Sequence, residues 1–345
     1  FGAGLIGGRL RQGSMNTTAF SFGPLGAKGF AFLNMLQLIG WTSIMIYDAM
    51  LALQELAPLS PIIWTIAIGA LVILWLFIGL HNTGYIQAIV SVLLLGLTLY
   101  MGAHMISQWP SEGIILTSGN MSFIAALELS IAMPLSWLPL ISDYTRESKK
   151  PFSASLTSAT VYTVTSIVMY TLGLSAAIFG GGDSIITIMM NAGLGLAGLI
   201  VIIFSTVTTT FMDAYSAGVS STTIYKSASS KGIAVVVTIV GTIAAILYPM
   251  DDITDFLYLI GSVFAPMIAI LLADYFINRQ QVQTLSAYLV RGLIWAVSVG
   301  LYHYMLHSES TIGATLPAFT MAFVVTAIVG FISHTENSSV EIKQH

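Results

Sequence analysis

Ten apolar stretches, each long enough to cross a lipid bilayer, dominate the sequence. A membrane-spanning helix needs roughly 20 mostly apolar residues. Such stretches lie at residues 30–53, 61–80, 85–107, 121–142, 152–179, 194–222, 233–249, 253–276, 286–306 and 312–333. Of the 345 residues only 8% are charged, against roughly 25% in soluble domains. We therefore predict an all-α integral membrane protein with a single polytopic domain, embedded in the lipid bilayer and followed by a polar, disordered tail from residue 333.

The basic residues predict the orientation of these spans. All eleven Lys and Arg fall on one side or at the span ends nearest to it, whereas the loops on the other side contain none. The positive-inside rule makes the basic side, and with it both termini of the chain, cytoplasmic. The net charge of −4 and the lack of a basic run argue against nucleic acid as a partner. The chain has no cysteine, which excludes disulfides and thiolate metal sites.

The fourth span contains two prolines, Pro134 and Pro139, five residues apart. Each proline removes a backbone donor and leaves a carbonyl one turn earlier without its helical partner. In lipid such a carbonyl needs protein, water or a ligand. A span broken at Ser136 and Trp137 is typical of the midplane binding sites of secondary transporters. A plain proline kink would have the same pattern.

Polar side chains form one helical face in each of two other spans. In the first span they recur at steps of three and four, as Asn34, Gln37, Trp41, Met45 and Asp48. The sixth span carries a similar face, made of Ser205, Thr208, Thr209, Asp213, Ser216 and Ser220. Such faces are expected to turn toward the bundle interior or a cavity. The hydroxyl groups could instead bond carbonyls of their own helix or join neighbouring helices.

A charged carboxylate inside a span costs several kcal/mol of free energy in lipid unless it is paired or protonated. Asp213 and Glu128 lie well inside their segments and are therefore candidate functional groups. Asp48, Asp255 and Asp274 lie closer to span ends and are expected to contact water.

Two deep tryptophans suggest the kind of ligand. Membrane tryptophans usually gather at the interfaces, but Trp41 and Trp137 lie near mid-span. Either alone is most simply explained by packing, whereas together they could hold a planar heteroaromatic ring by stacking. Thr208, Thr209 and the carbonyl of Ser205 could supply oxygen ligands to a hard cation such as sodium. The sequence has no cofactor motif and no catalytic triad, so neither a cofactor nor an enzyme is predicted.

The sequence resembles the nucleobase–cation symport family (NCS1), and within it the hydroxymethylpyrimidine permeases, which import a thiamine precursor. Three motifs carry the resemblance: Leu-Gln-Leu-Ile-Gly-Trp at 36–41, Pro-Leu-Ser-Trp-Leu-Pro-Leu-Ile-Ser-Asp-Tyr-Thr-Arg at 134–146, and Thr-Thr-Thr-Phe-Met-Asp-Ala-Tyr-Ser-Ala-Gly at 208–218. The resemblance extends over essentially the whole chain.

The resemblance implies a LeuT-like fold with a five-plus-five inverted repeat and two further helices. On this basis, residues 30–107 hold helices three to five and residues 121–276 hold helices six to ten. Residues 286–333 hold helices eleven and twelve. Ten of the expected twelve transmembrane helices are present, residues 1–8 would end helix two, and the rest of the cation site would lie in the missing N-terminal part.

The resemblance also implies roles for individual residues. The substrate site is expected to contain Trp41, Ser136, Trp137 and Asp213. Gln37 and Glu128 are further candidates because of their polar positions inside the spans. Thr208, Thr209 and the Ser205 carbonyl are expected to form half of a sodium site.

The expected function is cation-coupled import of a pyrimidine, first of all hydroxymethylpyrimidine, across the plasma membrane or the inner membrane of a prokaryote. The alternatives are a cytosine, purine or allantoin permease of the same family and, from another class, a non-transporting membrane scaffold or decayed fragment. The coupling ion could be sodium at the threonines or a proton on Asp213 or Glu128.

Overall fold

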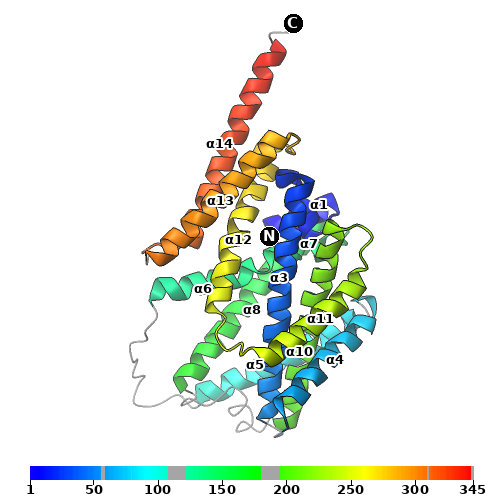
Figure 1. Ribbon diagram of the computed structural model, residues 1–345. Helices are drawn as coiled ribbons and strands as arrows, with labels where there is room; N and C mark the ends of the chain where they lie inside the picture. Colours follow the sequence, from blue (N-terminus) through cyan, green and yellow to red (C-terminus); the bar gives the residue numbers. More distant parts are fainter. Residues whose placement is uncertain (56–58, 79, 108–121, 180–194, 309–310, 343–345) are drawn as a thin grey trace.

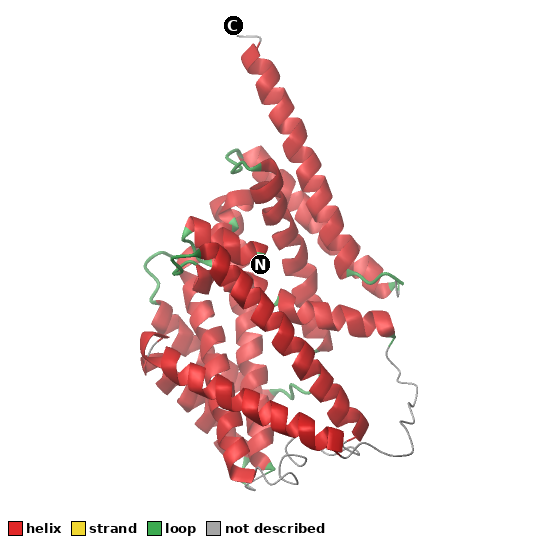
Figure 2. Cartoon of the chain, turned by 180° about the vertical axis from the view of Figure 1, so that it is seen from behind, coloured by secondary structure: helices red, strands yellow, loops and turns green. Residues whose placement is uncertain are grey.

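The computed structural model describes residues 1–345 except 56–58, 79, 108–121, 180–194, 309–310 and 343–345. Its regular elements are all helices in the described part of the chain (Figures 1 and 2). They are α1 (Gly2–Leu10), α2 (Ser14–Thr17), α3 (Ala19–Gln54), α4 (Pro61–Ile78), α5 (Leu80–Ser107), α6 (Phe123–Leu135), α7 (Leu138–Thr145), α8 (Pro151–Phe179), α10 (Gly195–Ile224), α11 (Ser230–Leu247), α12 (Thr254–Leu272), η1 (Ala273–Asn278), α13 (Leu285–His307) and α14 (Thr315–Ile342). The described residues contain ten helical segments long and apolar enough to span a membrane, as predicted.

α3 and α14 extend furthest beyond their predicted limits. α3 begins at Ala19 and has a kink at Gly23, whose backbone angles (φ 68°, ψ 180°) strongly favour glycine, just before Pro24. α14 continues to Ile342 and projects from the bundle (Figure 1). The prediction of a disordered tail from residue 333 was therefore wrong. After Gly330 the sequence has no glycine or proline that would end the helix.

The helices pack in two groups beside the broken span. α3, α4, α10 and α11 pack on one another, and α12 packs against α6, α13 and α14. α12 is the most deeply buried of these helices, and Phe264 and Met267 on it belong to the largest apolar core. Many large apolar side chains on α4, α5 and α8 are exposed, as expected for helices that face lipid.

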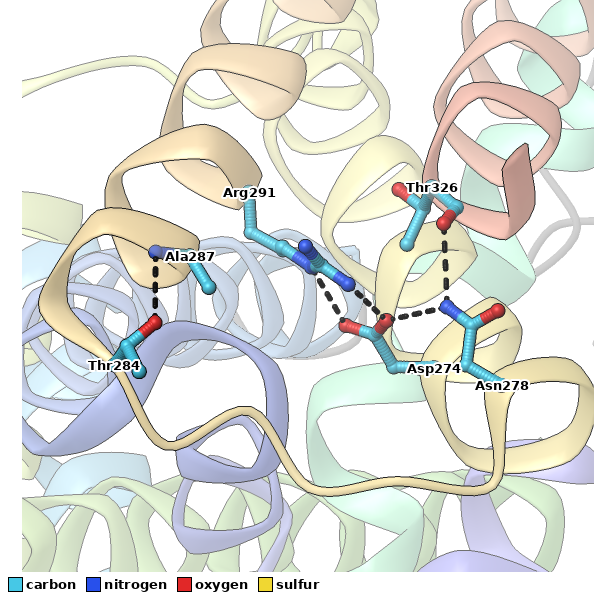
Figure 3. Close-up of polar contacts among 6 residues, drawn as sticks. All are labelled: Asp274, Asn278, Thr284, Ala287, Arg291 and Thr326. Atoms are coloured by element: carbon cyan, nitrogen blue, oxygen red, sulfur yellow. Dashed lines mark hydrogen bonds and ion pairs between the residues drawn. The ribbon is translucent and has the colours of Figure 1, made fainter. Parts of the chain in front are cut away.

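A buried ion pair and a neighbouring asparagine attach α13 and α14 to η1, which follows α12 directly (Figure 3). In the short π-helical segment η1, Asp274 accepts hydrogen bonds from Arg291 of α13, with Nη2 to Oδ1 at 3.0 Å and Nε to Oδ2 at 3.3 Å. Asn278 donates to Asp274 Oδ1 at 2.8 Å and to the Thr326 carbonyl of α14 at 3.2 Å. The expectation that Asp274 contacts water was wrong, because it is 0% exposed and its charge is neutralised by Arg291.

Candidate functional site

The predicted break in the fourth span is confirmed by the backbone. α6 ends at Leu135 and α7 begins at Leu138, with Ser136 and Trp137 between them. The Leu140 amide donates to the Trp137 carbonyl at 3.0 Å, which makes it a poor donor for the Ser136 carbonyl four residues back. The Ser136 carbonyl instead accepts from Gln37 Nε2 of α3 at 3.2 Å. A side chain from another helix therefore satisfies the carbonyl that the break sets free.

Trp41, Ser136, Trp137, Thr209 and Asp213 line one cavity, although they come from three different parts of the sequence. The cavity has a volume of about 70 Å³. It lies between α3, the α6–α7 break, α8 and α10, and its remaining lining residues are Leu38, Met45, Met133, Leu140 and Tyr162. Tyr162 was not predicted, and α8 offers no signal for it because polar residues occur on every face of that helix.

The two tryptophans reach the cavity from α3 and from the α6–α7 break, and each packs against another aromatic ring. Trp41 packs edge-on against Phe256, with ring centroids 5.5 Å apart. Trp137 lies beside Tyr144 and Tyr162, at centroid distances of 6.1 and 6.0 Å. The Trp41 indole Nε1 is buried and has no hydrogen-bond partner among the described residues.

Asp213 of α10 is the only acidic residue among the described residues that line the cavity. Its side chain is largely buried, with the whole residue 8% exposed. A carboxylate buried inside a membrane span needs a hydrogen-bond donor beside it or must be protonated. A ligand with an amino group or a ring N–H would supply that donor.

The predicted cation ligands lie together on α10. Thr208 Oγ1 and Thr209 Oγ1 each donate to the Ser205 carbonyl at 2.9 Å. These are the within-helix bonds that threonine commonly makes, and they gather three oxygens at one point. Each hydroxyl oxygen retains a lone pair that could bind a cation, and Thr209 also borders the cavity.

Gln37 and Glu128 do not line this cavity. The Gln37 amide is buried and donates to the Ser136 carbonyl and to Asn34 Oδ1, the latter at 2.7 Å. Glu128 accepts from the Thr315 amide at 3.0 Å and from its hydroxyl at 2.6 Å. It thereby caps the first turn of α14, where a negative charge is favourable.

Comparisons with known proteins agree with this architecture. Residues 3–342 match the family described as permeases for cytosine/purines, uracil, thiamine and allantoin. The chain is similar to the nucleobase-cation-symport-1 family transporter Mhp1 in a closed conformation with bromovinylhydantoin bound. The identity is 17%, the TM-score is 0.75, and the match covers 97% of this chain and 85% of Mhp1.

Two further structures and one negative result complete the comparison. Inward-facing Mhp1 matches with 14% identity and a TM-score of 0.67 over 97% of this chain and 88% of that one. The outward-open state of a Na⁺-coupled sialic acid symporter matches with 17% identity and a TM-score of 0.66 over 93% and 76%. A comparison with curated protein sequences gave no match.

These likenesses establish a LeuT-like fold. The family match covers nearly the whole chain. The protein is therefore a multi-pass membrane protein that belongs to the family of permeases for cytosine and purines, uracil, thiamine and allantoin.

Proposed function

We propose that this protein is a cation-coupled secondary transporter that imports a pyrimidine across the plasma membrane or the inner membrane of a prokaryote. The observation that carries the proposal is the cavity lined by Trp41 and Trp137, with Asp213 as the one acidic residue among its described lining residues. Two indoles that line one small cavity favour a flat ring, and aromatic contacts of this kind contribute about 0.5–1.5 kcal/mol each.

The size of the cavity favours a single ring. One water molecule needs roughly 10–15 Å³ of such space, so a cavity of about 70 Å³ accommodates about five to seven waters. That space suits one substituted six-membered ring and is too small for a nucleoside. Hydroxymethylpyrimidine is our first candidate because its amino group can donate to Asp213 and its hydroxyl can bond Ser136. Cytosine offers a similar amino group and is the second candidate, whereas purines and allantoin are larger or not aromatic.

Sodium is the coupling ion that the α10 oxygens favour, since Thr208, Thr209 and the Ser205 carbonyl are hard ligands without a net charge. Asp213 is the group that would carry a proton instead, because it lines the same cavity. In either case the cation and the ring bind to neighbouring turns of α10. Joint occupancy would then favour the closed state, from which the cavity opens to the other side.

Uptake assays in cells that express the protein test the substrate. Accumulation of labelled hydroxymethylpyrimidine is expected, and unlabelled cytosine should compete weakly. Cytosine uptake without hydroxymethylpyrimidine uptake would reject the first candidate and retain the class of transporter. Uptake of neither, by protein shown to be folded in the membrane, would reject pyrimidine transport.

The coupling ion is tested by uptake with and without sodium at fixed pH. Thr209→Val should abolish any dependence on sodium. Thr210→Val is the matched control, because Thr210 donates to the Thr206 carbonyl at 2.8 Å and does not line the cavity. If uptake does not depend on sodium and is lost in Asp213→Asn, the proton is the coupling ion.

A further inference from the structure

Four buried side chains and the partly buried Tyr144 form hydrogen bonds between α3, α10 and the broken span, and α7 itself packs only slightly on α10. These side chains are Asn34 and Gln37 of α3, Tyr144 of α7, and Ser216 and Ser220 of α10, and we call them the polar latch. They lie beyond the cavity toward the helix ends that carry the basic residues. By the positive-inside rule that side is the cytoplasm.

In the first half of the polar latch, side chains of α3 contact backbone carbonyls at the break between α6 and α7. Gln37 Nε2 donates to the Ser136 carbonyl at 3.2 Å, and Asn34 Nδ2 approaches the Pro139 carbonyl at 3.5 Å. Asn34 also donates to Ser220 Oγ of α10 at 2.8 Å. Because Asn34 Oδ1 and the Ser136 carbonyl are both acceptors, the orientation of the Gln37 amide is fixed by its neighbours.

The second half of the polar latch lies further along α7. The Tyr144 hydroxyl is 3.2 Å from the Met212 carbonyl and 3.2 Å from Ser216 Oγ, both on α10. It can donate to the carbonyl and accept from the serine at the same time. Ser216 is fully buried, so these bonds are shielded from competing water.

α7 is held mainly by the N-terminal helices α1 and α2. Three short bonds tie it to the N-terminal helices: Ser142 Oγ to the Ala3 carbonyl at 2.8 Å, Thr145 Oγ1 to the Gly4 carbonyl at 2.8 Å, and the Ser14 amide to Asp143 Oδ1 at 2.8 Å. α7 packs mainly on α1, and its packing against α10 is slight. The direct contact of α7 with α3 and α10 is made by the polar latch and by a small apolar cluster around Leu38, Leu140 and Ala217.

We propose that the polar latch keeps the cavity closed toward the cytoplasm, and that its rupture is the step that opens the cavity to that side. This inference rests on the proposed transport function. Separation of α7 from α3 and α10 leaves the Ser136 carbonyl without its donor Gln37 and the Tyr144 hydroxyl without its partners on α10. A buried carbonyl is costly until water reaches it, so rupture and entry of water from the cytoplasm occur together. The latch thereby sets the ratio of closed to inward-open molecules.

Spin-label distances measure this ratio without a substrate. The chain has no native cysteine, so Glu147→Cys and Tyr225→Cys introduce unique label sites at the ends of α7 and α10. Both side chains are exposed. Gln37→Leu, Tyr144→Phe and the milder Ser216→Ala should each increase the population with the longer distance. The expected increase is roughly 2- to 12-fold for each hydrogen bond lost.

Tyr215→Phe is the matched control, because Tyr215 lies beside Tyr144 and its hydroxyl has no hydrogen-bond partner among the described contacts. Unchanged distances in Ser216→Ala and Tyr144→Phe, in monodisperse protein, would overturn the latch. Longer distances in these variants would support the latch even if the protein imported no pyrimidine, which would reject only the proposed substrate.

Discussion

The buried pair Asp274–Arg291 offers a sharp test of how the peripheral helices are attached. Asp274 is 0% and Arg291 5% exposed, and two hydrogen bonds join them across η1 and α13. Arg291→Met leaves the Asp274 carboxylate with Asn278 as its remaining donor among the described contacts. Loss of one partner of a buried ion pair costs about 3–5 kcal/mol. Asp274→Leu should cost a similar amount, because it leaves the Arg291 cation buried and unpaired.

The double variant Asp274→Leu/Arg291→Met distinguishes a buried charge from a general packing defect. Two apolar side chains can replace a buried pair at little cost. Asn278 then loses one acceptor and keeps the Thr326 carbonyl, which costs about 1 kcal/mol. The double variant should therefore lie within about 1–2 kcal/mol of the original protein and be more stable than either single variant.

Reversible unfolding in mixed micelles, titrated with SDS, gives the free energy of unfolding of each variant. Glu147→Gln is the matched control. It removes the Arg146–Glu147 pair, whose side chains are 24% and 78% exposed, and should cost less than about 1 kcal/mol. If both single variants of the buried pair cost as little as this control, burial does not determine the strength of the pair and the reasoning is refuted.

Three further predictions concern individual residues. Trp137→Ala should raise the KM of pyrimidine uptake about tenfold through lost stacking, whereas Trp137→Phe and the control Trp75→Phe should change it little. An unchanged KM in Trp137→Ala would contradict the stacking role. Glu128→Gln should lower the free energy of unfolding by about 1–3 kcal/mol and leave the KM of pyrimidine uptake unchanged. A raised KM would show that Glu128 contributes to substrate binding. Gly23→Ala should destabilise the protein by about 1–3 kcal/mol because of its backbone angles, and Gly29→Ala, which has open space around it, should not. Equal stability of the two glycine variants would argue against strain at the kink.

The cavity could be predicted only in part from the sequence. Trp41, Trp137 and Asp213 stand out because each violates a general rule for residues in lipid, and the structure brings these three together. Glu128 violates the same rule, yet it caps α14 through Thr315, which lies 187 residues further along the chain. No local pattern distinguishes a carboxylate that faces a cavity from one that caps a distant helix.

The sequence by itself determines the ten spans and the break, since both follow from local chemistry. Lipid offers no partner for a backbone amide, so an apolar stretch of sufficient length must form a helix, and proline removes a donor wherever it occurs. The partners of polar groups are decided only by the tertiary structure. Gln37 donates a hydrogen bond to the Ser136 carbonyl from another helix. Asp274 can be buried because Arg291, also from another helix, forms an ion pair with it. The physical reason is that the cost of burying such a group depends on which donors or acceptors the other helices bring within about 3 Å of it.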